Sequence, residues 1–315
     1  VPGRWKLSLK NLIIWMVTIE IILTSVFLSQ TGKPLQEEYT RESNYYTVEV
    51  SWRSMGNDNV KMLRLDRLAH GFTKPGHPTF LFYDYLKVFQ EITRYTSREN
   101  KAPRLLHLGG GAYTFPRYME TVYPDSINEV VEIDPAVTEA AYRALGLPLT
   151  TSIKTYNQDA RLFLIQRKAE DRYDFIIGDV FNDRSVPYHL TTLEFDRLVK
   201  SNLKDEGFYL INIIDDTERG RYLPSFFHTL RQAFKYVYLF STGPGKGIKP
   251  FAIAATDRNL DIADYTKFVT GDGTKALEGT PYDKTRLEAY LSGKKPILLT
   301  DDYSPTDILV APLAQ

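Results

Sequence analysis

Apolar and polar positions in the N-terminal third of the chain follow three successive patterns. Residues 12–28 are apolar on every side of a helix, with Glu20 as the one charged position. Residues 45–52 and 60–68 alternate between apolar and polar side chains on either side of turn-forming residues, as the strands of a β-hairpin do. Residues 79–97 carry apolar side chains at helical spacing. These patterns predict an apolar helix, a β-hairpin module and an amphipathic helix, in that order.

From residue 104 onward, short apolar runs alternate with helical segments, which is typical of an α/β domain. Parallel strands need long crossovers, whereas the loop 241–249 is too short for one. The first five strands are therefore predicted to be parallel and the last two to form an antiparallel hairpin. Residues 257–295 are polar and are predicted to be a mobile excursion. The strands of this single seven-stranded sheet are predicted at 105–108, 129–133, 152–156, 173–178, 207–214, 236–240 and 251–256.

The apolar segment 12–28 is at the lower limit of length for a membrane-spanning helix. A carboxylate at mid-bilayer depth costs about 2.5–3.5 kcal/mol, so Glu20 would face other helices or a partner subunit. A signal peptide and a helix buried against a partner are the alternatives. We expect four parts in the chain: a membrane-associated helix at 1–30, a linker at 31–44, the β module at 45–78 and the α/β domain at 79–315.

Composition and charge narrow the classes of function. Of the 315 residues, 43% are hydrophobic and 25% are charged, as in an ordered globular protein. The 39 basic side chains balance 39 acidic ones, which disfavours nucleic acid as a partner because such proteins carry a basic surface. The chain has no cysteine, so disulfides, cysteine nucleophiles and thiolate metal sites are excluded.

A run of glycines followed by an acid indicates a nucleoside-binding crevice. Gly109, Gly110 and Gly111 end the first strand of the α/β domain, where glycine lets the backbone approach a ligand closely. Glu132 lies 21 residues beyond Gly111, at the end of the second strand, where a carboxylate can accept hydrogen bonds from both ribose hydroxyls. Thr114 stands where the dinucleotide fingerprint has its third glycine, so NAD is the second choice of cofactor.

Two further acids, Asp159 and Asp179, follow later strands of the predicted sheet. Because the carboxyl ends of adjacent parallel strands share one crevice, we expect both acids to converge with Glu132. Asp159 has an alternative interpretation as the N-cap of the helix that follows it, and so does Asp134. Asp179 precedes a loop instead, so its alternative is to brace that loop.

Several segments of the sequence form a specific set when they are taken together: LRLDRLAH (63–70), the tyrosine of FLFYDYL (80–86), HLGGG (107–111), VVEIDP (130–135), NQDARLFL (157–164), YDFIIGDVFND (173–183) and HLTTLEFDRLVKSNLKDEGFYLIN (189–212). The set resembles the spermidine synthase family, the aminopropyltransferases built on the class I methyltransferase fold. The apolar helix and the closing TDDYSPTD most resemble the branch of that family fused to membrane segments. The resemblance implies a Rossmann-like, methyltransferase-like fold for the α/β domain.

The same resemblance implies the residues that would bind the co-substrate, decarboxylated S-adenosylmethionine or S-adenosylmethionine. The glycine loop would face its methionine-derived part, with His70 near the tail. Glu132 would bind the ribose, and Asp159, with Ala160 beside it, would contact the adenine amino group. No metal is implied.

For catalysis, the resemblance matches Asp179 to the family's catalytic aspartate and Tyr83 to the tyrosine that orients the attacking amine. It implies that the substrate-binding residues are Asn182, Asp183, Tyr188 and Tyr303. Two positions depart from the family pattern. Ala112 replaces an aspartate that binds the primary amine of decarboxylated S-adenosylmethionine, and Asn182 replaces an acid of the polyamine-binding loop.

The implied reaction is transfer of an aminopropyl group to a polyamine or another small amine, with release of 5′-methylthioadenosine. One alternative is methyl transfer, carboxyaminopropyl transfer or cleavage with intact S-adenosylmethionine, which Ala112 favours because an aspartate there would repel the carboxylate. The other is a non-catalytic module that senses nucleosides or polyamines, which Asn182 favours.

Two arguments about location conflict. Arg4, Lys6 and Lys10 precede the apolar helix, which by the positive-inside rule would put the α/β domain outside the cell. S-adenosylmethionine, however, is made inside cells, and we give this argument more weight. We expect a homo-oligomer attached to the cell membrane through residues 12–28, with its catalytic domain on the cytoplasmic side.

Overall fold

The computed structural model of the protein describes residues 37–179, 186–243 and 245–311. The expected membrane helix at 12–28 and two of the implied substrate-binding residues, Asn182 and Asp183, lie outside these ranges. Within the described ranges, no helix combines the length and the apolar character needed to cross a bilayer.

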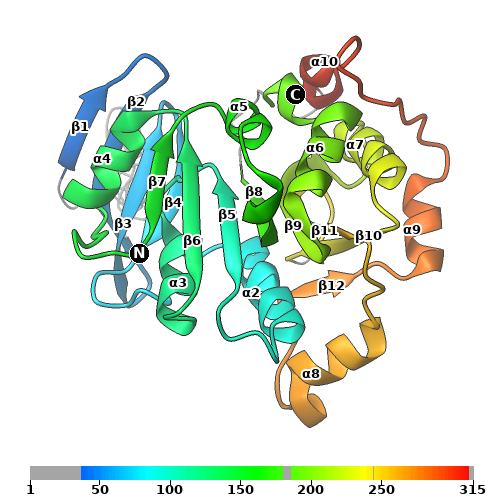
Figure 1. Ribbon diagram of the computed structural model, residues 1–315, viewed down its shortest axis with the longest axis horizontal. Coiled ribbons are helices and arrows are strands. Elements are labelled where there is room, and N and C mark those ends of the chain that lie inside the picture. The colour runs from blue at the N-terminus through cyan, green and yellow to red at the C-terminus, as the bar shows by residue number, and fades with distance from the viewer. Residues whose placement is uncertain (1–36, 180–185, 244, 312–315) are drawn as a thin grey trace, which may run out of the picture.

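A small antiparallel sheet opens the described chain (Figure 1). Its strands pair in chain order: β1 (Glu37–Glu42), β2 (Thr47–Met55), β3 (Asp58–Leu65) and β4 (Leu68–Thr73). The predicted hairpin is confirmed as β2 and β3. The prediction of a linker at 31–44 is wrong for residues 37–42, which form β1. Their charged sequence, EEYTRE, has no apolar alternation, and the strand is specified by its pairing with β2.

The large sheet has eight strands in the order β12-β10-β11-β9-β8-β5-β6-β7. The seven predicted strands are all present, β5 to β9 are parallel, and β10 and β11 form the predicted antiparallel hairpin. The eighth strand, β12, was not predicted. The bounds are β5 (Arg104–Leu108), β6 (Ile127–Glu132), β7 (Lys154–Asn157), β8 (Tyr173–Gly178), β9 (Leu203–Asp216), β10 (Tyr236–Thr242), β11 (Ile248–Thr256) and β12 (Gly279–Pro281).

Helices cover both faces of the large sheet, because successive side chains of a strand point to opposite faces. Ile176 packs with α5, α6 and α7 on one face, whereas Phe175 and Ile177 pack with α2, α3 and α8 on the other. The helices are α2 (Asp84–Thr96), α3 (Thr114–Val122), α4 (Pro135–Arg143), α5 (Ala160–Ile165), α6 (Leu193–Asn202), α7 (Tyr222–Ala233), α8 (Ile262–Thr274), α9 (Lys284–Leu291) and α10 (Thr306–Val310). Short 3₁₀ turns lie at Ala169–Asp171 and Tyr188–Leu190.

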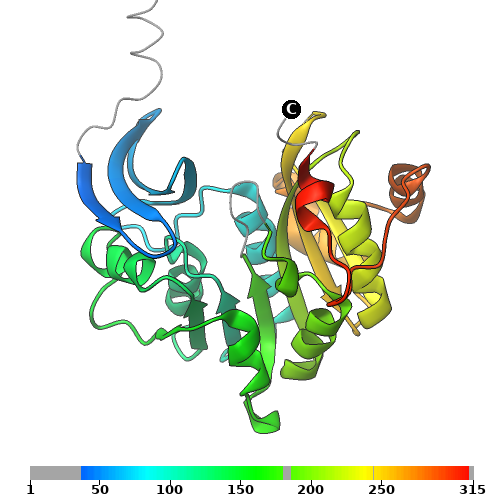
Figure 2. The same cartoon turned by 90° about the horizontal axis from the view of Figure 1, so that it is seen from above.

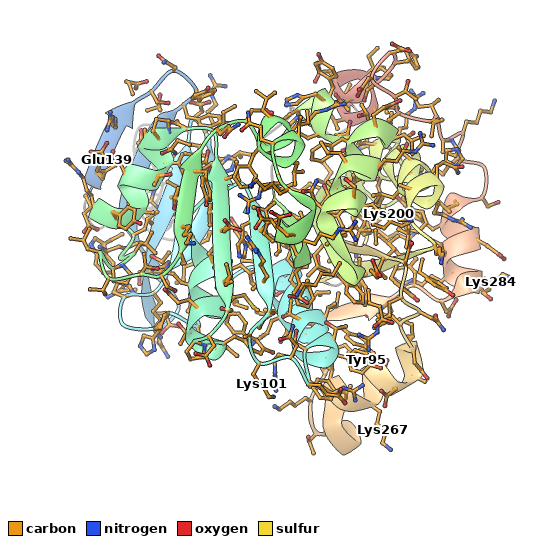
Figure 3. The ribbon with its side chains drawn as sticks, viewed as in Figure 1. Tyr95, Lys101, Glu139, Lys200, Lys267 and Lys284 are labelled. Carbon is orange, nitrogen blue, oxygen red and sulfur yellow. The ribbon has the colours of Figure 1, made fainter. Side chains whose placement is uncertain are left out.

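The segment 257–295 is structured, which corrects the expectation of a mobile excursion. Its surface is polar, with Lys267 on α8 and Lys284 on α9 at the outer edge of the molecule (Figure 3). Its inner side, however, is tied to the domain by Tyr265, which is fully buried and donates a hydrogen bond of 2.9 Å to Glu91 on α2. A few buried contacts therefore order a segment whose average composition is that of a loop.

The small sheet packs beside the large one, with α4 beneath it (Figure 2). Strand β4 lies so close to the glycine loop that a Cβ atom at Gly71 would stand 2.5 Å from Cβ of Ala112. The hydroxyl of Thr114 also donates a hydrogen bond of 3.2 Å to the carbonyl of Phe72. The small sheet therefore forms one wall of the crevice above the glycine loop.

Candidate active site

Two adjoining cavities lie where the carboxyl ends of β5, β6 and β8 meet. The inner cavity, of about 40 Å³, runs between the glycine loop, Tyr83, Tyr85 and Asp179. The outer cavity, of about 120 Å³, runs past Glu132 and Asp159. Asp179, His70, Gly109 and Gly111 line both. The strand order reverses at β5, which pairs with both β6 and β8, and such a point is where open α/β sheets bind ligands.

The glycine loop follows the backbone path that the sequence predicts. Gly109 and Gly111 have φ angles of 90° and 47°, which residues other than glycine rarely adopt. A Cβ atom at Gly110 would lie 2.6 Å from the ring of Tyr113. Gly110 also donates its backbone N–H to Oε2 of Glu132 at 2.8 Å. The loop is thereby tied to the acid at the end of the neighbouring strand.

Glu132 is buried in the wall of the outer cavity, where backbone donors orient it. Its second oxygen, Oε1, accepts a hydrogen bond of 2.9 Å from the backbone N–H of Asp134. Burial raises the pKa of the Glu132 carboxyl, and the hydrogen bonds from Asp134 and Gly110 oppose that rise. Backbone donors on both oxygens leave the remaining lone pairs of this carboxylate in preset directions.

Asp159 is both an N-cap and part of the outer cavity wall. Its Oδ1 accepts the backbone N–H of Leu162 at 2.9 Å, so the N-cap interpretation is confirmed, as it is for Asp134, which accepts from Ala136 at 2.8 Å. Asp159 can fill both roles because the helix cap uses only Oδ1, which leaves Oδ2 for contacts in the cavity. Ala160 lines the same cavity.

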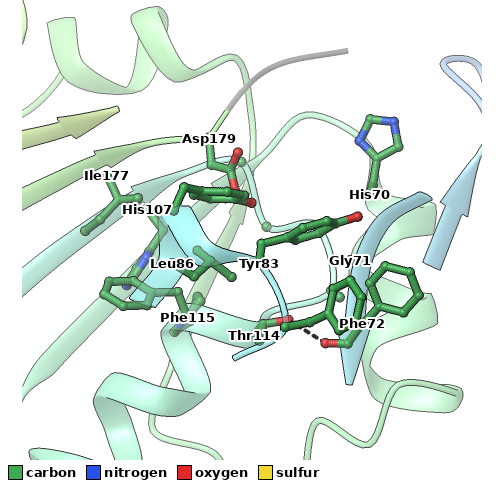
Figure 4. Close-up of a pocket in the computed structure, with 17 residues that line it drawn as sticks. His70, Gly71, Phe72, Tyr83, Leu86, His107, Thr114, Phe115, Ile177 and Asp179 are labelled. Atoms are coloured by element: carbon green, nitrogen blue, oxygen red, sulfur yellow. Dashed lines mark hydrogen bonds between the residues drawn. The ribbon is translucent and has the colours of Figure 1, made fainter. Parts of the chain in front are cut away.

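Asp179 lines the inner cavity (Figure 4), where this cavity meets the outer one, and its carboxylate is held by two side chains. Oδ2 accepts a hydrogen bond of 2.8 Å from the hydroxyl of Tyr85, and Oδ1 accepts one of 3.2 Å from the amide of Asn212. Burial raises the pKa of the Asp179 carboxyl, while these two donors and the charge of His70 lower it. A carboxylate so placed can hold an ammonium group and accept its proton.

Tyr83 lies in the inner cavity, but its hydroxyl is directed to the small sheet. It donates a hydrogen bond of 2.9 Å to the carbonyl of Ala69, and its ring stacks on that of Tyr85 at 5.6 Å between centroids. The hydroxyl that reaches Asp179 belongs to Tyr85. Tyr85 escaped the sequence analysis because it shares the apolar stripe of its helix, whereas Asn212 has a detectable signal, a polar residue in an apolar strand.

Two of the implied substrate-binding residues do not reach the cavities. Tyr188 is 57% exposed and Tyr303 is 61% exposed, and neither lines the inner or the outer cavity. Across the described ranges, the structure also has no cluster of three or more His, Asp or Glu side chains that could hold a metal ion.

Comparison with known proteins finds relatives of one kind. No family model matches the chain. A polyamine aminopropyltransferase of Vibrio vulnificus is 33% identical over 113 residues, which are 36% of this chain and 38% of that protein. A probable polyamine aminopropyl transferase of Bifidobacterium longum is 25% identical over 229 residues, 67% of this chain and 49% of that protein. The chain is therefore similar in sequence to the polyamine aminopropyltransferases, as the resemblance to the spermidine synthase family predicts.

A solved structure confirms the predicted fold of the protein. The crystal structure of a probable spermidine synthase from Corynebacterium glutamicum superposes with a TM-score of 0.71 at 23% identity, over 82% of this chain and 95% of that one. The fold is therefore the Rossmann-like, class I methyltransferase-like fold. The chain matches less than half the length of each of the two curated relatives. Membership in the membrane-fused branch stays a prediction.

Proposed function

We propose that this protein, as a member of the spermidine synthase family, transfers an aminopropyl group from decarboxylated S-adenosylmethionine to an amine and releases 5′-methylthioadenosine. The observation that carries the proposal is the position of Asp179, at the junction of a cavity suited to a nucleoside and a cavity lined by tyrosines. The two curated relatives named above are a polyamine aminopropyltransferase and a probable one, which supports the same reaction.

The residues of the outer cavity fit the nucleoside part of such a co-substrate. Glu132 offers preset acceptor positions for the two ribose hydroxyls, and Asp159 offers an acceptor for the adenine amino group. Val131, Ile133 and Leu190 supply apolar wall for the base. The backbone of the glycine loop then separates this cavity from the inner one, where the transferred group would lie.

Asp179 would act on the attacking amine. An alkylammonium group with a pKa of about 10 is not a nucleophile, so it must lose a proton as its nitrogen attacks the carbon. The N–C bond forms as the C–S bond breaks, the electron pair of the C–S bond stays on sulfur, and the proton goes to Asp179. The sulfonium is already an activated leaving group, so alignment by Asp179 and the stacked tyrosines supplies much of the acceleration.

Intact S-adenosylmethionine as the donor is the second candidate, and Ala112 favours it. Ala112 is buried against Gly71 in the wall of the inner cavity, so this position offers no carboxylate to bind the amine of a decarboxylated donor. A donor that keeps its carboxylate would meet no repulsion there. Methyl transfer, carboxyaminopropyl transfer and cleavage are the reactions open to it.

Product analysis separates these candidates. The protein is incubated with each sulfonium donor, with and without putrescine, and the products are identified by mass spectrometry. Methylthioadenosine and spermidine formed together, only from the decarboxylated donor and only with putrescine, are expected. S-adenosylhomocysteine would instead establish methyl transfer, and methylthioadenosine formed without an amine would establish cleavage. Binding without turnover of either donor would make the domain a sensor.

We also propose that residues 12–28 attach the protein to the cell membrane as a homo-oligomer, with the α/β domain on the cytoplasmic side. The support is the apolar sequence of that segment and the intracellular origin of S-adenosylmethionine. External protease should leave the domain intact in sealed cells. Digestion from outside would reverse the orientation, and extraction without detergent would remove the membrane attachment.

A further inference from the structure

The outer cavity contains a polar side chain to which neither the sequence analysis nor the proposed reaction gives a role. His189 lies on the short turn Tyr188–Leu190, lines the cavity and places Nε2 2.9 Å from Oδ2 of Asp159. An ionised carboxylate only accepts hydrogen bonds, so Nε2 carries the proton of this contact. Asp159 therefore has two fixed donors, Leu162 N–H on Oδ1 and His189 on Oδ2.

The backbone of His189 is fixed by residues that are distant in the sequence. Arg161, on α5, donates to the carbonyl of His189 at 3.0 Å and to Oδ1 of Asp301 at 2.7 Å. Asp301 in turn accepts a hydrogen bond of 2.6 Å from Thr192, the N-cap of α6. The Asp301 carboxylate thus connects the closing segment of the described chain to the turn that carries His189.

We infer that His189 is a positioning residue that orients the Asp159 carboxylate so that the site selects 6-aminopurine over 6-oxopurine nucleosides. This inference rests on the proposed function, in which Asp159 meets the adenine amino group. The terminal torsion of an aspartate is broad when nothing restrains it. Donors on both oxygens restrict it and point the remaining lone pairs in fixed directions, where an exocyclic amine can donate.

Selectivity follows from the charge of Asp159. A 6-oxopurine presents a carbonyl oxygen where adenine presents its amino group, so two acceptors would face each other without a proton between them. Sites built around a hydrogen bond discriminate strongly against a ligand that leaves their polar group unpaired. A carboxylate free to rotate could turn away from the carbonyl, and the discrimination would fall.

A simpler role for the contact is to brace the turn. In that case loss of His189 would lower the stability of the protein and the affinity for all nucleosides alike. The two roles therefore differ in one measurable quantity, the ratio of affinities for 5′-methylthioadenosine and 5′-methylthioinosine.

The test is calorimetric titration of both nucleosides into the full chain and its variants. We expect His189→Ala to weaken methylthioadenosine binding about tenfold, the size of one charge-assisted hydrogen bond, with a much smaller change for methylthioinosine. His189→Gln, which keeps an N–H donor at similar reach, should restore most of the ratio. Asp301→Asn should lower the ratio less, because it weakens only the contact with Arg161, which fixes the backbone of His189. His77→Ala, at an exposed position, is the matched control.

Each outcome is decisive. If the wild-type protein binds neither nucleoside, the proposed function fails and the inference fails with it. If the wild type prefers methylthioadenosine and His189→Ala keeps the same ratio, the inference alone is overturned. Unfolding midpoints of all variants show whether a change in affinity is a loss of folded protein, and rescue by His189→Gln excludes that explanation for the ratio.

Discussion

The two cavities hold their carboxylates in different ways. In the outer cavity, Glu132 accepts hydrogen bonds from the backbone N–H groups of Gly110 and Asp134. Asp159 accepts one from the backbone of Leu162 and one from the side chain of His189. In the inner cavity, Asp179 depends on the side chains of Tyr85 and Asn212. The carboxylate of Glu132 is thus positioned by the path of the chain, that of Asp159 by the chain and one side chain, and that of Asp179 by side chains.

The two kinds of support suit different roles. A carboxylate with backbone donors on both oxygens, as Glu132 has, keeps its orientation when surrounding side chains change, which suits the binding role that we propose for it. A carboxylate held by a hydroxyl and an amide can have its pKa adjusted by replacing either partner, which suits a group that takes up a proton. Substitutions should therefore affect binding in one cavity and turnover in the other.

The largest expected effect is that of Asp179→Asn. The amide keeps the shape of the side chain but cannot accept a proton, so turnover should fall at least about a hundredfold while affinity for methylthioadenosine changes little. Steady-state rates and calorimetry on the same preparation measure both quantities. Full turnover in this variant would remove Asp179 from the chemistry, and a loss of folding without loss of chemistry would make it a brace for its loop.

Glu132→Ala should have the second largest effect, and on binding instead of turnover. Loss of charge-assisted hydrogen bonds to both ribose hydroxyls would weaken methylthioadenosine binding by about 2–3 kcal/mol. Calorimetry against 2′-deoxy-methylthioadenosine is the control, because the variant should no longer distinguish it from the ribonucleoside. Unchanged affinity would take Glu132 out of the ribose site.

Tyr85→Phe tests the side-chain support of Asp179. The Tyr85 hydroxyl lowers the pKa of the Asp179 carboxyl, which burial raises above its usual value. Since Asp179 must be ionised to accept a proton, the reaction rate rises with pH through the pKa of Asp179, which gives the pH–rate profile an acidic limb. Removal of the Tyr85 hydroxyl should shift this limb to higher pH. We expect a loss of about tenfold at the foot of the limb.

Tyr83→Phe is the matched control for this prediction. Its hydroxyl is bonded to Ala69, not to Asp179, so its pH–rate profile should keep the wild-type limb. If Tyr83→Phe shifts the limb and Tyr85→Phe does not, the sequence-based assignment of Tyr83 is correct and the assignment from the geometry is wrong.

The smallest expected effect concerns a buried acid that lines neither cavity, Glu91 on α2. Burial raises the pKa of Glu91 to about 7. The folded state therefore binds a proton more tightly than the unfolded state, so this residue's contribution to the free energy of unfolding falls as pH rises from about 4.5 to 7. In Glu91→Gln, the amide oxygen can still accept the backbone N–H of Glu278, while the amide N–H donates to the hydroxyl of Tyr265, which donates in the wild type.

Thermal unfolding at several pH values measures this contribution. Between pH 5 and 7, the midpoint of the Glu91→Gln protein should fall about 2–4 °C less than that of the wild type. Asp264→Asn, at an exposed position of α8, is the control and should leave the slope nearly unchanged. Equal slopes for wild type and Glu91→Gln would show that Glu91 is ionised throughout.

The sequence was informative where local chemistry sets the structure. The seven main strands, the glycine loop and the convergence of three acids follow from periodicity and from the geometry of parallel strands. Tyr85 was missed because its partner, Asp179, is 94 positions away, and the same helical stripe serves packing. Strands β1 and β12 were missed because their pairing partners, not their own alternation, specify them.

The close approach of Gly71 to Ala112 makes these two positions dependent on each other in evolution. A side chain at 71 would collide with Ala112, and the space for the Cβ atom of Ala112 exists because residue 71 has none. A descendant of this protein could therefore acquire a side chain at position 71 only after position 112 had become glycine. The order in which substitutions arise would then restrict which donors the lineage can come to use.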